Sequence, residues 1–134
     1  MSRAKAYLFD RLCSFKELER AWLAVLAHYP KGRIPAELRE FDRYRGRELA
    51  RIVTALRERV FIPQPASLIS IPKPGHPEER RPIALVRPDD RIVLGALAHL
   101  LNPLWEPQFL AHSYAYRPGR GAWSAIERVA KCLG

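Results

Sequence analysis

Cysteine is scarce in this chain of 134 residues, which contains only Cys13 and Cys132. The two form no C-x-x-C pair, so the sequence indicates neither a disulfide framework nor a zinc site. The four histidines show no metal-ligand spacing either. This pattern fits a protein of a reducing compartment such as the cytoplasm.

Long apolar runs are also missing. The opening residues, "MSRAKAYLFDRLCSF", contain no continuous apolar stretch of the kind that makes a signal peptide. No window approaches the roughly 18 apolar residues of a membrane span. We therefore expect a soluble, cytoplasmic protein with no membrane contact, long enough for one domain with a hydrophobic core.

Acidic residues are the minority among the charged ones. The chain has 14 Asp and Glu against 23 Lys and Arg, for a net charge of +9, and the charges are spread along its length. Such a balance favours an anionic partner, with nucleic acid as the leading candidate. A basic, soluble surface without any polyanion partner remains the alternative.

The hydrophobic pattern predicts an α+β fold, mostly helical with one antiparallel β-hairpin. Ser14 and Glu17 form a capping box before a helix that carries Leu18 and Trp22 on its apolar face. A second helix is expected around Ile52, with its arginines on the other side. We predict an N-terminal helical region over 1–65, a hairpin over 66–87, a helix over 88–104, a connector over 105–120 and a helix over 121–133.

Three details of these elements can be tested. The segment "PKPGHPEER" predicts a loose hairpin loop of roughly six to eight residues. Pro88 suits the first turn of a helix, and Asp89 and Asp90 suit the positive end of its dipole. The last helix is expected to turn one apolar stripe inward, consisting of Ala122, Ile126, Val129 and Leu133.

Four blocks resemble the opening blocks of group II intron-like reverse transcriptases, including the branch associated with CRISPR adaptation. Between residues 69 and 126 these blocks are "IPKP", "RRPIALV", "RPDDRIV" and "HSYAYRPGRGAWSAI", and their spacing matches the family. The resemblance implies that residues 66–134 are the fingers of an RNA-directed DNA polymerase with a right-hand architecture. The implied partners are template RNA, a primer strand and the incoming dNTP.

The resemblance also implies roles for single residues. Lys73 and Arg81 correspond to the family's residues that hold the triphosphate of the incoming nucleotide, and Arg80 is a second candidate. Arg87 and Arg91 lie where the family contacts the template, and the block with Tyr116, Arg117 and Arg120 supports the nascent duplex. Two alternatives stay open: Tyr114 and Tyr116 could pack within the connector, and Arg117 could pair with Asp89 or Asp90.

The sequence lacks the two palm aspartates that hold magnesium in such polymerases. Asp89 and Asp90 open a helix and are better interpreted as dipole residues. We therefore expect no metal, no cofactor and no catalysis from this chain alone, with Mg²⁺ bound only in a complete polymerase. The palm would come from a partner polypeptide or from further sequence at the C-terminal side.

Two other functions remain open. The chain could be a free-standing, non-catalytic module that binds RNA or RNA–DNA hybrids, or an interaction protein without nucleic acid. If it is a finger without its palm, apolar faces such as the last helix and "NPLWEPQFL" would lack their cover. Self-association through those faces is then expected. The sequence does not distinguish intron mobility, spacer acquisition and phage defence.

Overall fold

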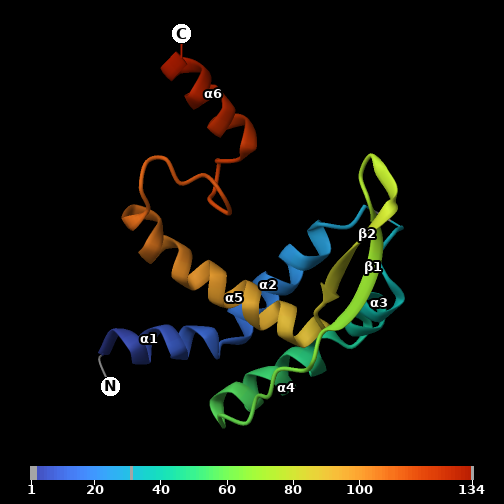
Figure 1. Cartoon of the computed structure of the whole chain (residues 1–134). Coiled ribbons are helices and arrows are strands. Elements are labelled where there is room, and N and C mark those ends of the chain that lie inside the picture. Colours follow the sequence, from blue (N-terminus) through green and yellow to red (C-terminus); the bar gives the residue numbers. More distant parts are fainter. Residues whose placement is uncertain (1–2, 31, 134) are drawn as a thin grey trace. The chain divides into compact units, whose positions relative to one another are not determined.

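The computed structural model describes residues 3–30 and 32–133. These residues form six α-helices and one two-stranded antiparallel sheet, so the predicted mixed α+β fold is confirmed (Figure 1). The elements are α1 (Arg3–Leu12), α2 (Phe15–Ala27), α3 (Ala36–Arg43), α4 (Arg45–Arg57), β1 (Ser67–Lys73), β2 (His76–Leu85), α5 (Pro88–Trp105), the short 3-10 helix η1 (Glu106–Gln108) and α6 (Ala122–Leu133).

The chain divides into two compact units, one ending at Leu100 and the other beginning at Leu101. The boundary lies inside α5, so the first unit contains α1 to β2 and most of α5. The division of the chain at residue 65 concerns polymerase subdomains and stays a prediction. Among the described residues, no helix is long and apolar enough to cross a membrane.

The core of the first unit is built where α2, α4 and α5 meet. Helix α2 begins as predicted, because the Ser14 side chain accepts a hydrogen bond from the Glu17 backbone N–H at 3.3 Å. Trp22 is fully buried, packs 4.5 Å from the ring of Phe41 and donates to Asp42 Oδ1 at 2.9 Å. The full set of buried apolar residues is Leu12, Cys13, Leu18, Ala21, Trp22, Leu38, Phe41, Leu49, Ile52, Val53, Leu56, Ile92, Val93, Ala96 and Leu100.

Strands β1 and β2 form an exposed ribbon with a very short turn. The structure pairs Lys73 with His76, so only Pro74 and Gly75 connect the strands. The predicted loop of six to eight residues is wrong, because Gly75 adopts a φ of +78° and closes the chain tightly. The acidic residues that suggested a loop, Glu78 and Glu79, lie within β2 instead.

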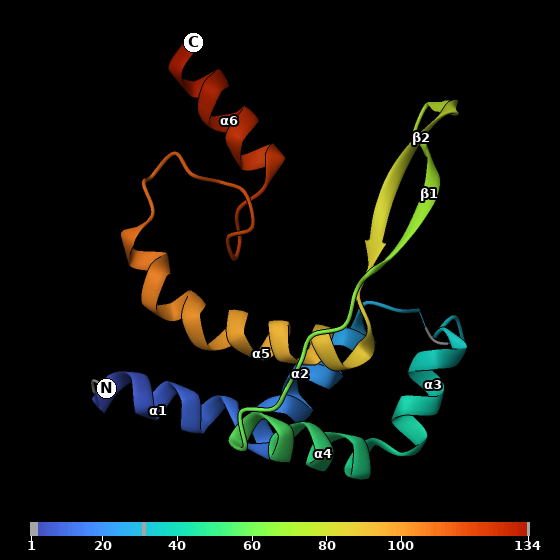
Figure 2. The ribbon, with the colours of Figure 1, turned by 60° about the horizontal axis from the view of Figure 1, so that its bottom comes forward.

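The ribbon projects away from the helices of the first unit (Figure 2). Within it only Ile71 and Ile83 are half-buried, and the remaining residues are exposed. An open two-stranded ribbon tolerates polar residues on both faces, which explains why charged residues continue through β2. The hairpin therefore presents its side chains to solvent on a short support.

The second unit has no hydrophobic core among its described residues, 101–133. Helix α6 contains no buried residue. The prediction that Ala122, Ile126, Val129 and Leu133 face inward is wrong, since all four are exposed and Leu133 is 84% accessible. The stripe exists, but no described element of this unit covers it. Arg117 is the one buried residue in this part of the chain.

Candidate nucleic-acid interface

The strand register sorts the basic residues of the hairpin onto two faces. Ile71 lies opposite Arg81, and Pro72 lies opposite Arg80. Directly opposed residues in an antiparallel pair share a face, and neighbours along a strand alternate. Arg81 therefore lies on the Ile71 face, and Arg80 lies on the other one.

Lys73 lies on the same face as Arg81. Lys73 lies two positions after Ile71 along β1, and Glu79 lies two positions before Arg81 along β2. The Lys73 ammonium forms an ion pair with the Glu79 carboxylate, which confirms that these two side chains meet. A register shift between Pro72 and Lys73 gives Lys73 the strand partner His76, so the ion pair with Glu79 is what places Lys73 beside the Arg81 face. One face of the ribbon thus carries Lys73, Arg81 and a displaceable carboxylate.

The two hairpin arginines differ in what they contact. Arg80 Nη2 donates to the Ser70 carbonyl across the ribbon at 2.6 Å. The Arg81 guanidinium is exposed and takes part in no hydrogen bond or ion pair with the described residues. Arg81 is therefore the hairpin arginine with all of its donors available to a ligand.

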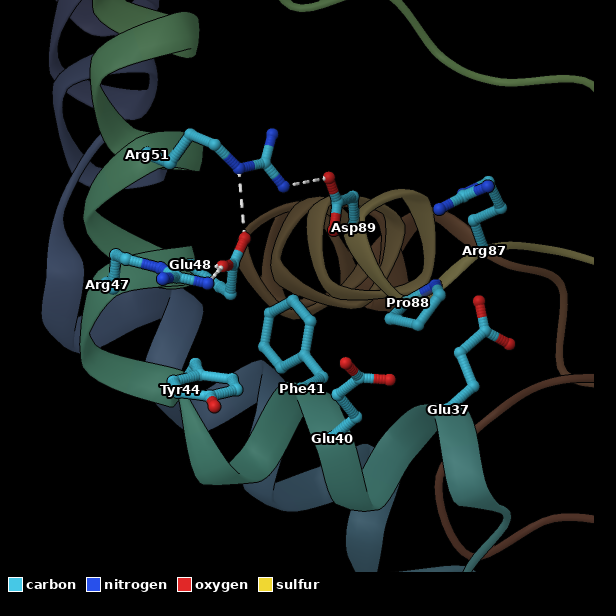
Figure 3. Close-up of a pocket in the computed structure, with 10 residues that line it drawn as sticks. All are labelled: Glu37, Glu40, Phe41, Tyr44, Arg47, Glu48, Arg51, Arg87, Pro88 and Asp89. Atoms are coloured by element: carbon cyan, nitrogen blue, oxygen red, sulfur yellow. Dashed lines mark hydrogen bonds and ion pairs between the residues drawn. The ribbon is translucent and has the colours of Figure 1, made fainter.

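Below the hairpin, a pocket of about 240 Å³ opens between α3, α4 and the start of α5 (Figure 3). Arg51 occupies one side, where its guanidinium pairs with Asp89 and its Nε lies 3.0 Å from Glu48 Oε2. Arg47 donates to the same Glu48 carboxylate at 2.8 Å. The pocket is lined by Glu37, Glu40, Phe41, Tyr44, Arg47, Glu48, Arg51, Arg87, Pro88 and Asp89.

These contacts keep Glu48 and Arg51 in their charged forms. Hydrogen bonds from Arg47 and Arg51 hold the pKa of Glu48 below its usual value. The hydrogen bond to Asp89 raises the pKa of Arg51 further above neutrality. Arg87 lines the same pocket, yet its exposed guanidinium forms no ion pair with any described residue. Of the arginines in this pocket, Arg87 is thus the one whose donors are all without a partner among the described residues.

Arg91 is less available than Arg87. Its Nη1 donates to the Tyr29 hydroxyl at 3.0 Å, and its guanidinium lies 5.7 Å from the centre of that ring. The side chain is half-buried between α5 and the end of α2. Arg91 can still place positive charge near a ligand, but it also holds the two helices together.

Arg117 is a clamp inside the second unit. Its Nε and Nη2 bind the Glu106 carboxylate at 3.0 and 2.7 Å, and its Nη1 donates to the carbonyls of Leu110 and Ser113 at 2.9 and 2.8 Å. The acid that pairs with Arg117 is therefore Glu106. This bond also lowers the pKa of Glu106 from its ordinary value. With its side chain 6% exposed and all three guanidinium nitrogens hydrogen-bonded inside the unit, Arg117 serves the loop and not a nucleic acid.

Tyr116 and Arg120 flank this clamp and remain accessible. Tyr116 is 104% exposed and adopts a φ of +57°. Arg120 Nη1 donates to the Ala111 carbonyl at 2.6 Å, and its guanidinium lies 5.7 Å from the centre of the Tyr114 ring. Tyr114 therefore packs within the connector, as one of the alternatives expected, whereas Tyr116 does not.

The carboxylates of this chain do not fit the two magnesium ions of a polymerase. Asp89 is held by Arg51, and Asp90 is 5% exposed with its Oδ2 bound to the Gln64 N–H at 3.0 Å. His76, Glu78 and Glu79 gather within 4.8 Å at the hairpin tip, but all three are exposed and Glu79 is paired with Lys73. Mg²⁺ is usually bound by one or two carboxylates together with water and substrate phosphates, whereas Asp89, Asp90 and Glu79 are held by protein partners.

Sequence reasoning missed three partners of the candidate residues: Glu79, Glu106 and Tyr29. Glu79 carries a usable signal, since it lies two residues before Arg81 and hence on the same strand face. Glu106 and Tyr29 carry none, because 11 and 62 residues separate them from their arginines. Such contacts depend on the tertiary structure.

Comparison with known proteins gives partial matches, and no protein-family model matches the chain. The chain is 37% identical over 69 residues to Protein YkfC of Escherichia coli strain K12, a match that covers 52% of this chain and 18% of YkfC. It is 24% identical over 93 residues to Group II intron-encoded protein LtrA of Lactococcus lactis subsp. cremoris, covering 69% of this chain and 15% of LtrA. The matches thus span less than a fifth of either relative.

The similarity to LtrA supports a distant relationship to group II intron-encoded proteins, in agreement with the four sequence blocks. Neither relative's name refers to CRISPR adaptation, so that branch stays a prediction.

Proposed function

We propose that this chain is the fingers portion of an RNA-directed DNA polymerase, and that it grips the triphosphate of the incoming dNTP. The observation that carries the proposal is the shared exposed face of Lys73 and Arg81 near the tip of the ribbon. The partial similarity to LtrA supports the same polymerase family.

The chemistry of the two side chains suits a triphosphate. A guanidinium can donate to two phosphate oxygens at once, and an ammonium adds a compact positive charge beside it. Arg81 has its donors free, and Lys73 exchanges the Glu79 carboxylate for phosphate when the nucleotide arrives. Arg80 lies on the opposite face, so it contributes positive charge near the site and does not contact the triphosphate directly.

The template strand is proposed to lie along Arg87 and Arg91, at the start of α5. Phosphate contacts of this kind position a nucleic acid without reading its sequence. Arg87 has free donors and makes the stronger contact, while Arg91 contributes from its place against Tyr29. In the second unit Tyr116 and Arg120 are proposed to contact the bound RNA strand, and Arg117 keeps their loop in shape.

The catalytic metal ions belong to the palm in this proposal. Magnesium ions there activate the primer hydroxyl and stabilise the leaving pyrophosphate. The chain itself binds and orients the nucleotide and the template, and the palm is supplied by a partner polypeptide or by further sequence.

A second function, a non-catalytic module for RNA or RNA–DNA hybrids, is favoured by a different observation. The exposed guanidiniums of Arg81 and Arg87 would bind phosphates with or without a polymerase. The two functions differ in their need for a palm, because only the first predicts nucleotide addition when a palm polypeptide is present.

Two measurements separate these functions. An antibody raised against the chain, applied to source cells, reports whether these residues belong to a polypeptide larger than 15.4 kDa. Primer extension is then measured with that larger protein, or with the chain mixed with a palm polypeptide. Extension that requires these residues supports the polymerase. Salt-dependent RNA binding without extension supports the module, and binding that ignores salt contradicts both.

A further inference from the structure

Tyr116 is held in a conformation that its own side chain does not favour. Its φ of +57° lies in the left-handed region, which residues other than glycine, asparagine and aspartate rarely adopt. Such a conformation persists only where the surroundings enforce it, and it is concentrated at functional sites. The ring gains no packing in return, because Tyr116 is 104% exposed.

The surroundings that enforce this conformation are the contacts of the next residue. Arg117 is buried, and its guanidinium is fixed to Glu106 and to the carbonyls of Leu110 and Ser113. Its planar group also lies 5.3 Å from the centre of the Phe109 ring. These bonds fix the position of Arg117, so the turn that leads into it is made at Tyr116.

We propose that Tyr116 is a stacking platform for an unpaired base of single-stranded RNA. Both faces of its ring are accessible, and aromatic rings that stack bases are the usual platforms of single-strand sites. Arg120 lies four residues further on, with one donor on the Ala111 carbonyl and the rest available for a phosphate. This proposal depends on one part of the proposed function, namely that the chain binds RNA.

The test compares two RNA oligonucleotides of equal length, one of adenylates and one with abasic sugars, which carry the same phosphates. Affinity is measured for the full chain and for its Tyr116→Gly and Tyr116→Phe variants over a series of salt concentrations. Glycine removes the ring and accepts the positive φ, so this variant cannot fail through backbone strain. Tyr7→Ala is the matched control, because Tyr7 is also an exposed tyrosine.

The proposal predicts that Tyr116→Gly weakens binding to the adenylate oligonucleotide by about five- to 150-fold. Binding to the abasic oligonucleotide and the salt slope stay unchanged, since no phosphate contact is lost. Tyr116→Phe and Tyr7→Ala bind like the unaltered chain. If Tyr116→Gly binds the adenylate oligonucleotide as tightly as the unaltered chain does, the platform is overturned. That result is expected if Tyr116 contacts a protein instead of RNA. The proposed function fails separately, when the unaltered chain binds neither oligonucleotide in a salt-dependent way.

Discussion

The carboxylate of Asp90 accepts a hydrogen bond from the backbone N–H of Gln64 at 3.0 Å. Asp90 is buried at the start of α5, and Gln64 belongs to the extended segment that leads into β1. This bond ties the base of the hairpin to the helical core of the first unit. The other oxygen, Oδ1, is buried without a hydrogen-bond partner among the described residues.

Replacing Asp90 by alanine is expected to loosen this tie. The Gln64 N–H would lose its charged acceptor, and the free energy of unfolding of the first unit should fall by about 1.5–3 kcal/mol, the range for hydrogen bonds to charged groups. Urea denaturation measures the difference. Asp90→Asn should cost less, because the amide oxygen still accepts from Gln64 and no charge stays buried. Equal losses in both variants would show that the carboxylate acts in another way.

Glu17 should make the first unit sensitive to acid. Burial alone would raise the pKa of Glu17, but hydrogen bonds from Arg20 and His99 outweigh it and hold the pKa below its ordinary value of 4.5. A carboxyl group with a lowered pKa in the folded state stabilises the protein above its unfolded pKa. This stabilisation is lost as the pH falls from that value through the lower folded one.

The melting temperature should therefore drop more steeply below about pH 4.5 in the unaltered chain than in Glu17→Gln. Thermal melts followed by circular dichroism across this range test the difference. Glu127→Gln, at an exposed position of α6, serves as the control and should melt like the unaltered chain. Parallel pH profiles for Glu17→Gln and the unaltered chain would contradict the account.

Arg117→Lys should open the loop over residues 106–120. A lysine ammonium cannot reproduce a planar group that binds one carboxylate twice and two carbonyls as well. Hydrogen–deuterium exchange in this loop should rise on the order of tenfold or more, in line with the loss of charge-assisted hydrogen bonds. Exchange in α2 and α4 should not change, since those helices belong to the first unit. A protected loop in this variant would contradict the clamp.

Glu79→Gln should strengthen nucleotide binding. In the free chain Glu79 pairs with Lys73, and a triphosphate has to displace it. Exposed ion pairs contribute about 0–1 kcal/mol, so removing this competitor should tighten dNTP binding by up to about fivefold. Competition between a labelled dNTP and inorganic triphosphate gives the affinity. Glu78→Gln is the control, because Glu78 forms no ion pair with a lysine or arginine among the described residues. Weaker binding by Glu79→Gln would exclude this face of the ribbon as the triphosphate site.

The local signals in the sequence were sufficient for the main elements. The N-cap at Ser14 and the first-turn position of Pro88 are confirmed because both depend on residues within one turn. The reciprocal half of the capping box does not form, since the Ser14 N–H donates to the Arg11 carbonyl and the Glu17 carboxylate binds Arg20 and His99. The hairpin loop was predicted too long, because the acids at 78 and 79 are typical of loops. Only the pairing of Lys73 with His76 reveals that they lie in a strand.

The sites could be predicted only as far as local pattern reaches. The block "RRPIALV" predicts Arg81 as a nucleotide-binding residue, and its exposed side chain is compatible with that role. The clamp of Arg117 could not be foreseen, because its partner Glu106 lies across a proline-rich connector with no periodicity. The prediction that the apolar stripe of α6 faces inward was wrong for a different reason. An amphipathic pattern shows which face of a helix is apolar, but not whether an element of the same chain covers that face.

The central claim is that Arg81 and Lys73 hold the triphosphate, and dNTP-dependent primer extension tests it most directly. The KM for dNTP and the affinity for the primer–template duplex are measured with the palm present, for Arg81→Ala and for Arg33→Ala, an exposed arginine before α3. The account predicts that Arg81→Ala raises the KM for dNTP by tenfold or more, as expected for a lost charge-assisted contact of about 1.5–3 kcal/mol. Duplex affinity should stay within about twofold, and Arg33→Ala should leave both values unchanged. An unchanged KM for dNTP in Arg81→Ala would contradict the assignment of this face of the hairpin.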